Sequence, residues 1–162
     1  MKCGEVLFDS KVDNWNNQKV FNERVFGKKQ IVFICEDKKG NKFGGFINAT
    51  IDKIASHEKW EYVKDPQSFL FSLRSNERLN GMMKFESIEE GGAMIQLFKH
   101  DDPDAHWIID FGFGDLKIWD YSERDKSCCN RNQAQYDFHG IKYPFTGSQG
   151  FILKRFIVIQ ML

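Results

Sequence analysis

The sequence predicts a mainly β protein, a two-sheet antiparallel β-sandwich with one or two peripheral helices. Two observations indicate this fold class. Apolar residues occur in short runs that recur about every 10 to 14 residues between turn-forming residues, and strands do not alternate with long helices. A chain of 162 residues is of the size that forms one domain, so residues 1–162 are expected to be a single unit.

Only two segments have helical character. The first begins at Asp13 or Asn14, either of which could cap a helix, and ends at Gly27, with apolar residues along one side. The second, residues 50–60, is shorter and carries a weaker pattern. The sequence therefore predicts one peripheral helix and leaves a second one open.

The remaining apolar runs are expected to be strands. Residues 31–34 and 42–51 read as a hairpin around a charged turn that contains Gly40. The last run, residues 151–161, is apolar on both faces, which is typical of a central strand. Five more candidate strands lie between them, at residues 68–73, 82–88, 93–98, 107–111 and 116–121.

The charge balance argues against a nucleic-acid partner. Lys and Arg number 23, and Asp and Glu also number 23, so the formal net charge is zero and no positive excess is available to neutralise phosphates. The sequence contains neither a secretory signal nor an apolar stretch long enough to span a membrane. We expect a soluble, cytoplasmic monomer without a cofactor, in which the cysteines are free thiols.

The stretch WIIDFGFGDLKIWDY, residues 107–121, contains letters of two nucleotide-binding motifs. Asp110 to Gly112 spell the Asp-Phe-Gly of protein kinases, but no other kinase motif accompanies them, and a dinucleotide fingerprint would need glycine where Lys117 stands. The glycines are therefore expected to serve the structure. They would lie within strands beside phenylalanines that pack across bare backbone: Gly44, Gly45, Gly112 and Gly114 beside Phe43, Phe46, Phe111 and Phe113.

Two further clusters do not predict a site. Residues 100–106 hold two histidines and three carboxylates, but their spacing matches no metal cage and Pro103 indicates an exposed turn, so no metal is expected. Ser148 stands in a Thr-Gly-Ser-Gln-Gly segment without the strand-to-helix turn of a catalytic serine. We interpret both segments as loops.

Cys128 and Cys129 are the redox candidates of the chain. They are adjacent and lie near Lys126 and Arg131, whose positive charges would favour the reactive thiolate. Such thiols could form a mixed disulfide or a sulfenate. In the alternative interpretation, one of the two is simply a small buried residue.

In order along the chain, these segments resemble the TLDc domain, the module at the C-terminus of oxidation resistance proteins and related intracellular proteins. VLFDS matches the first strand of that family, and NNQKVFNERVFG matches its helix. The hairpin IVFICEDKKGNKFGGF is the closest local match, followed by FLFSL and FGFGDLKIWD. DKSCCNRN corresponds to a Ser-x-x-Cys region, and GFILKRFIVIQM to the final strand.

The resemblance covers almost the whole chain, with two departures. Ile157 stands where the last strand of the family usually carries glutamate, and the family's glycine run is longer than Gly112 and Gly114 provide. The resemblance implies a sandwich core with outer helices and no accepted catalytic machinery. It also implies a protein-binding module linked to oxidative stress resistance and to the vacuolar-type proton ATPase. The alternative is a thiol-dependent antioxidant that uses Cys128 or Cys129.

Two loops late in the chain are richest in the aromatic and arginine side chains that anchor protein partners. If partners bind there, the contacts would come from Arg124, Arg131, His139, Tyr143 and Phe145. The alternative for Tyr143 and Phe145 is that they only pin the last loop onto the core.

Overall fold

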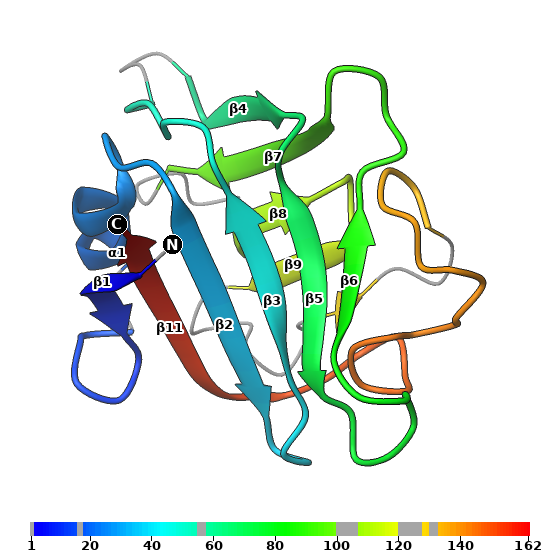
Figure 1. Cartoon of the computed structure of the whole chain (residues 1–162). Coiled ribbons are helices and arrows are strands. Elements are labelled where there is room, and N and C mark those ends of the chain that lie inside the picture. Colours follow the sequence, from blue (N-terminus) through cyan, green and yellow to red (C-terminus); the bar gives the residue numbers. More distant parts are fainter. Residues whose placement is uncertain (1, 16–17, 55–57, 100–106, 120–127, 130–132) are drawn as a thin grey trace.

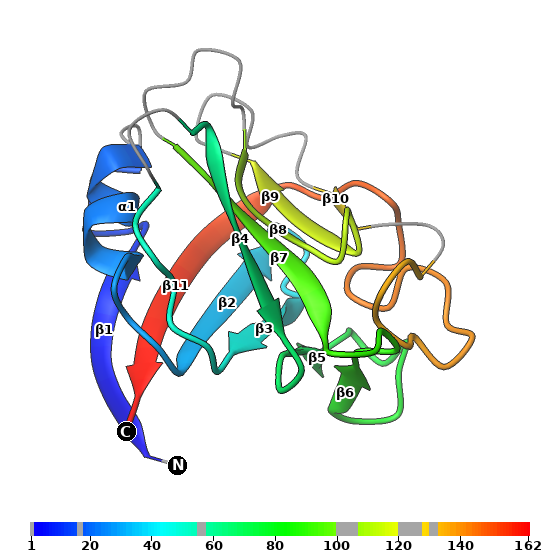
Figure 2. The same cartoon turned by 90° about the horizontal axis from the view of Figure 1, so that it is seen from above.

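The chain folds into two antiparallel β-sheets that pack face to face, and among the described residues one helix lies at their side (Figures 1 and 2). The computed structural model describes residues 2–15, 18–54, 58–99, 107–119, 128–129 and 133–162. The predicted mainly β sandwich is confirmed. Its elements are β1 (Cys3–Asp9), α1 (Gln18–Val25), β2 (Ile31–Asp37), β3 (Lys42–Ile47), β4 (Trp60–Asp65), β5 (Phe69–Arg74), β6 (Met83–Glu86), β7 (Ala93–Phe98), β8 (Trp107–Phe111), β9 (Leu116–Trp119), β10 (Cys128–Cys129) and β11 (Leu153–Met161).

The first sheet has six strands in the order β1-β11-β2-β3-β5-β6, and the second has five in the order β10-β9-β8-β7-β4. The last strand of the chain, β11, lies between β1 and β2 and pairs with both. This confirms that the apolar run at the C-terminal end is a central strand. In Figure 1 the six-stranded sheet faces the viewer and the second sheet lies behind it.

Helix α1 packs its apolar side onto an aromatic cluster at one side of the sandwich. The ring of Phe21 lies 5.7 Å from Phe8 on β1 and 5.9 Å from Phe156 on β11. The helix is followed by Gly27, whose positive φ of 81° ends the helical path. The predicted helix is therefore present and ends where the sequence indicates. Residues 13–15 are not helical, so the prediction that the helix begins at Asp13 or Asn14 is wrong.

Residues 51–54 are not helical, and β4 begins at Trp60, so the described part of the second candidate helix does not form one. Ile51 instead exchanges backbone hydrogen bonds with the segment after α1: Gly27 N–H donates to its carbonyl, and its own N–H donates to Lys28. Strand β4 was not predicted. It is an edge strand of the second sheet, and only its Val63 and Asp65 are buried. The sequence shows no alternating apolar pattern there.

The interior between the sheets is filled by apolar side chains, many of them aromatic. Phe33 on β2 meets Phe111 on β8 edge to face, with ring centres 5.7 Å apart. Gly44 and Gly45 on β3 each lie under a ring: Phe71 covers Gly44 from outside, and Phe111 covers Gly45 from the interior. The two glycines thus allow a ring to approach the backbone of β3 on each face.

The glycines of the FGFG stretch lie elsewhere than expected. Gly112 and Gly114 are in the turn between β8 and β9, not within a strand, and have positive φ angles of 66° and 100°. Phe113 between them is 54% exposed, so its side chain does not belong to the core. Alternation of aromatic and glycine residues resembles a strand in sequence, but the left-handed backbone conformation makes it a turn.

One ion pair ties the first strand to the last. Arg155 on β11 donates to both carboxylate oxygens of Asp9 on β1, at 3.0 and 2.5 Å, and Asp9 is nearly buried. The hydrogen bond from Arg155 holds the pKa of Asp9 below its usual value, although burial acts in the opposite direction. The pair thus stabilises the folded chain when Asp9 is ionised.

We expect acid to weaken the fold through this pair. Because the pKa of Asp9 is lower in the folded than in the unfolded chain, its contribution is present above about pH 4 and is lost as the pH falls through the lowered pKa. Urea denaturation between pH 7 and pH 2 should show Asp9→Asn to be less stable at pH 7 and to lose less stability on acidification. Parallel profiles of the two proteins would contradict this expectation.

Candidate functional site

The six-stranded sheet is apolar on both faces. Along β2, the side chains of Ile31, Phe33 and Cys35 are buried between the sheets, so Val32 and Ile34 point away from the second sheet. Directly paired residues of neighbouring strands share a face. The outer face, as we call the side away from the second sheet, therefore carries mainly apolar side chains: Val6, Val32, Ile34, Phe46, Phe69, Phe71, Leu73, Ile157 and Ile159.

No described helix or strand crosses the outer face, which lies open toward the viewer in Figure 1. Three apolar side chains on or beside it are well exposed, with 54% of Val6, 40% of Leu73 and 75% of Met82 accessible to solvent. The face is also hollowed by a depression of about 380 Å³ between β2, β5 and β6. Its lining is almost entirely apolar: Val32, Ile34, Phe69, Phe71, Ser72, Leu73, Met82, Met83 and Lys84.

The floor of this hollow is held in place by aromatic contacts. Phe46, Phe69 and Phe71 form a chain of rings with centres 5.1 and 6.2 Å apart. Lys84 lies over Phe69, with its Nζ 4.5 Å from the ring centre, and its ammonium pairs with Glu86 at 2.7 Å. The hollow is therefore a shaped surface on a rigid sheet, which is the kind of surface that accepts side chains of another protein.

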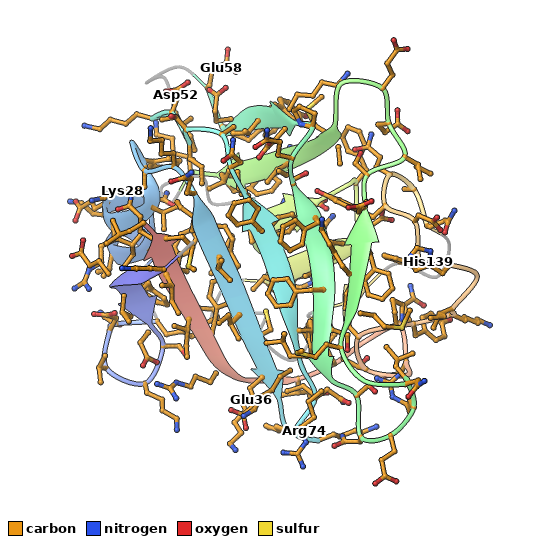
Figure 3. All side chains as sticks on the ribbon, viewed as in Figure 1. Lys28, Glu36, Asp52, Glu58, Arg74 and His139 are labelled. Carbon is orange, nitrogen blue, oxygen red and sulfur yellow. The ribbon has the colours of Figure 1, made fainter. Side chains whose placement is uncertain are left out.

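Charged side chains lie at the margins of the outer face. Figure 3 shows Glu36 and Arg74 together at one end of the sheet, with Lys28, Asp52 and Glu58 at the other. The hydrogen bond from Lys154, 2.9 Å long, lowers the pKa of Glu36, and the charges of Lys42 and Lys11 lower it further. Glu36 is therefore a carboxylate surrounded by cations.

Of the loop residues predicted to bind a partner, His139 is exposed at the edge of the first sheet (Figure 3). Its ring lies 3.3 Å from the Asp137 carboxylate and 3.2 Å from the Lys84 carbonyl. Tyr143 is half-buried, and the ammonium group of Lys142 lies 5.2 Å from its ring centre. His139 is therefore a surface side chain, whereas Tyr143 packs partly against the core, as in the alternative interpretation. Neither side chain lines the hollow.

Phe145 is not a surface residue. It is fully buried, and its ring lies 5.4 Å from Phe43, 5.7 Å from Phe85 and 5.6 Å from Phe138. The ring joins the last loop to the core, as in the alternative interpretation. Phe145 is therefore removed from the residues that could contact a partner.

Other predicted site residues lie outside the described residues. These are Arg124, Arg131 and the segment 100–106. For Cys128 and Cys129 the structure describes only the backbone, which forms β10 and pairs with Lys117 and Leu116 of β9. Within the described ranges, no group of His, Cys, Asp and Glu side chains is arranged to hold a metal ion.

Cys35 is a thiol that sequence analysis did not single out. It is fully buried between the sheets, and burial raises the pKa of the thiol, with the charge of Asp37 adding to the effect. A thiol of this kind stays protonated at neutral pH and is a poor nucleophile. Cys35 acts as a small core residue.

The outer face was the feature that sequence reasoning missed. A signal was available, because the runs IVFI and FLFSL are apolar at consecutive positions, and a strand of this kind is apolar on both sides. Such a run predicts that both faces are covered, whereas only the inner face is covered by a described element. No helix in the described part of the chain is long and apolar enough to span a bilayer.

Comparison with known proteins identifies a protein family. The family model of the TLDc domain matches residues 2–137 of the chain. A search of curated proteins returns no match. The matched residues include every strand except β11, which completes the first sheet from beyond the matched range.

Proposed function

The chain belongs to the TLDc domain family, and on this premise we propose that it is a non-enzymatic protein-interaction module whose binding surface is the outer face of the six-stranded sheet. The observation that carries the proposal is the open apolar hollow beside Leu73 and Met82. Contiguous apolar surface is rare on isolated soluble proteins and marks sites of interaction. A sheet that is apolar on both sides has a second face to cover, and a partner protein would cover it.

The resemblance that identifies the family also indicates the partner. We propose that the chain binds the vacuolar-type proton ATPase, regulates it, and through this contributes to resistance against oxidative stress. In this role it acts in the cytoplasm as a monomer. The formal net charge of zero is consistent with a protein partner, because it leaves no general attraction to nucleic acids.

The proposal predicts that a charge placed in the hollow weakens docking without unfolding the protein. Leu73→Asp and Met82→Asp should each weaken binding to the purified proton ATPase by about tenfold or more, because binding energy is concentrated in a few central apolar contacts. Both positions are exposed, so the free energy of unfolding should change little. Biolayer interferometry with the immobilised ATPase measures the affinity, and urea denaturation measures the stability.

Phe113→Asp is the matched control, since Phe113 is 54% exposed and lies in the turn between β8 and β9 of the second sheet, outside the hollow. It introduces the same charge and should leave the affinity unchanged. If Leu73→Asp and Met82→Asp bind the ATPase as well as the parent, the outer face is not the binding surface.

The thiol-dependent alternative makes a different prediction. Cys128 and Cys129 form the edge strand of the second sheet, whereas Cys35 is buried, so any peroxide chemistry of these three thiols belongs to the adjacent pair. As an interaction module, the protein should consume hydrogen peroxide at the same slow rate as a variant with Cys128→Ser and Cys129→Ser. A marked loss of peroxide consumption in the double variant would favour the antioxidant function.

A further inference from the structure

The hollow on the outer face lies beside the end of the sheet that carries Arg74 and Lys42, which we call the basic end. Its residue Leu73 is followed on β5 by Arg74, and Arg74 pairs across the sheet with Lys42 of β3. Ile34, another lining residue, lies on β2 two positions before Glu36. In Figure 3, Glu36 and Arg74 mark this end. A side chain bound in the hollow would thus be close to these charges.

Positive charge is in excess at this end. The Asp9–Arg155 pair is neutral as a unit. The four cations Lys11, Lys42, Arg74 and Lys154 then share one carboxylate, Glu36, with which only Lys154 forms an ion pair among the described residues. The excess is three charges, four minus one.

The neighbouring turns do not offset this excess. Residues 37–41 and 75–81 hold Lys38, Lys39 and Arg78 against Asp37 and Glu77, which adds one further positive charge. The whole chain is neutral, so the excess is a local feature of the end of the sheet that borders the hollow.

Lys42 and Arg74 are placed against each other. They are directly paired residues on neighbouring strands, both are exposed, and no carboxylate in the described part of the chain forms an ion pair with either. Like charges in directly opposite positions destabilise a sheet. A bound anion between them would relieve the repulsion. The pairing of Lys42 with Arg74 is therefore a second observation, in addition to the hollow, that indicates the chemistry of the bound segment.

We infer that the surface takes an acidic and apolar segment of a partner protein, with an apolar side chain in the hollow and carboxylates against Lys42 and Arg74. The inference rests on the proposed function and names the chemistry of the partner. A free small molecule fits less well, because small-molecule sites enclose most of their ligand, whereas Leu73 and Met82 are open to solvent.

Two labelled peptides test the inference. They share the same apolar residues, and the polar positions are all glutamate in one and all lysine in the other. In fluorescence anisotropy titrations with the full chain, the glutamate peptide should bind, more weakly as salt is added, and the lysine peptide should not. The double variant Lys42→Glu with Arg74→Glu should bind the glutamate peptide about tenfold more weakly and should gain affinity for the lysine peptide.

The matched control is Lys28→Glu with Lys29→Glu, which reverses two charges in the segment before β2 and should leave the glutamate peptide bound. Figure 3 shows Lys28 away from the end of the sheet that carries Glu36 and Arg74. Equal binding of both peptides, or of neither, overturns the inference. Binding of the chain to vesicles of phosphatidylserine and phosphatidylcholine without binding of the glutamate peptide also overturns it, in favour of a membrane surface. If neither peptide binds while Met82→Asp still weakens binding to the proton ATPase, the proposed function stands and only the inferred chemistry of the partner segment is wrong.

Discussion

Replacement of Gly44 by alanine is expected to lower the free energy of unfolding by about 3 kcal/mol. A Cβ atom at this position would overlap the main-chain carbonyl oxygen of Phe33 on β2 and would lie 3.0 Å from the ring of Phe71. The carbonyl belongs to a strand that is paired on both sides, with β11 and with β3. The backbone cannot move away without breaking part of the six-stranded ladder, so the strain is retained in the folded state.

Gly45→Ala provides the comparison, because at this neighbouring position of β3 a Cβ atom would meet side chains instead of backbone. A Cβ atom there would lie 2.7 Å from the ring of Phe111 and 3.0 Å from the Leu70 side chain. Side chains can shift where a backbone cannot, so we expect a smaller loss of about 1 to 2 kcal/mol. Urea denaturation of both variants measures the difference. A Gly44→Ala protein that is as stable as Gly45→Ala would show that β2 and β3 separate easily.

Asp115→Ala is the second substitution with a large expected effect, a loss of about 3 kcal/mol in the free energy of unfolding. The buried carboxylate of Asp115 accepts three backbone hydrogen bonds, from Ala134, Gln135 and Tyr136, at 2.7, 2.8 and 2.9 Å. Removal of the carboxylate leaves these N–H groups without an acceptor, and the N–H of Tyr136 lies in the interior, where it costs most.

The consequence extends across the sandwich. Asp115 lies directly before β9 of the second sheet. The segment that it holds is bonded to β6 of the first sheet, where Asp137 N–H donates to the Glu86 carbonyl, and to Ser68 directly before β5, whose hydroxyl shares a hydrogen bond with that of Tyr136. Asp115→Ala should therefore loosen the connection between the two sheets, and hydrogen exchange at Gln135 and Tyr136 should accelerate.

Asp137→Ala is the control for Asp115→Ala. Asp137 lies in the same segment, but its half-exposed carboxylate accepts one backbone hydrogen bond, from His139 at 2.8 Å. We expect a loss below about 1 kcal/mol for this variant. If the two substitutions cost the same in thermal or urea denaturation, the three hydrogen bonds of Asp115 do not carry the stability assigned to them.

The sequence by itself was sufficient for the fold class, the helix and most of the strands. Short apolar runs between turn residues are a local pattern of the sequence, and such a pattern indicates where the backbone forms a strand. The central position of residues 153–161 was also predicted, because a run that is apolar at consecutive positions is typical of a central strand. The family was also readable, because its motifs occur in order along the chain. The edge strand β4 was missed because the side that faces the core carries Glu61 and Asp65 beside Val63, so its apolar residues do not alternate as in a half-buried strand.

Only the tertiary structure decided which surfaces are available to a partner. Phe145 and Met82 are both apolar and both lie outside the strands of the structure, yet one is enclosed by three aromatic rings and the other is 75% exposed. Burial depends on which distant segments pack above a residue. The basic end of the outer face has the same origin, because Lys42 and Arg74 meet only when β3 pairs with β5. Strand pairing joins residues far apart in the chain, and no local pattern contains that information.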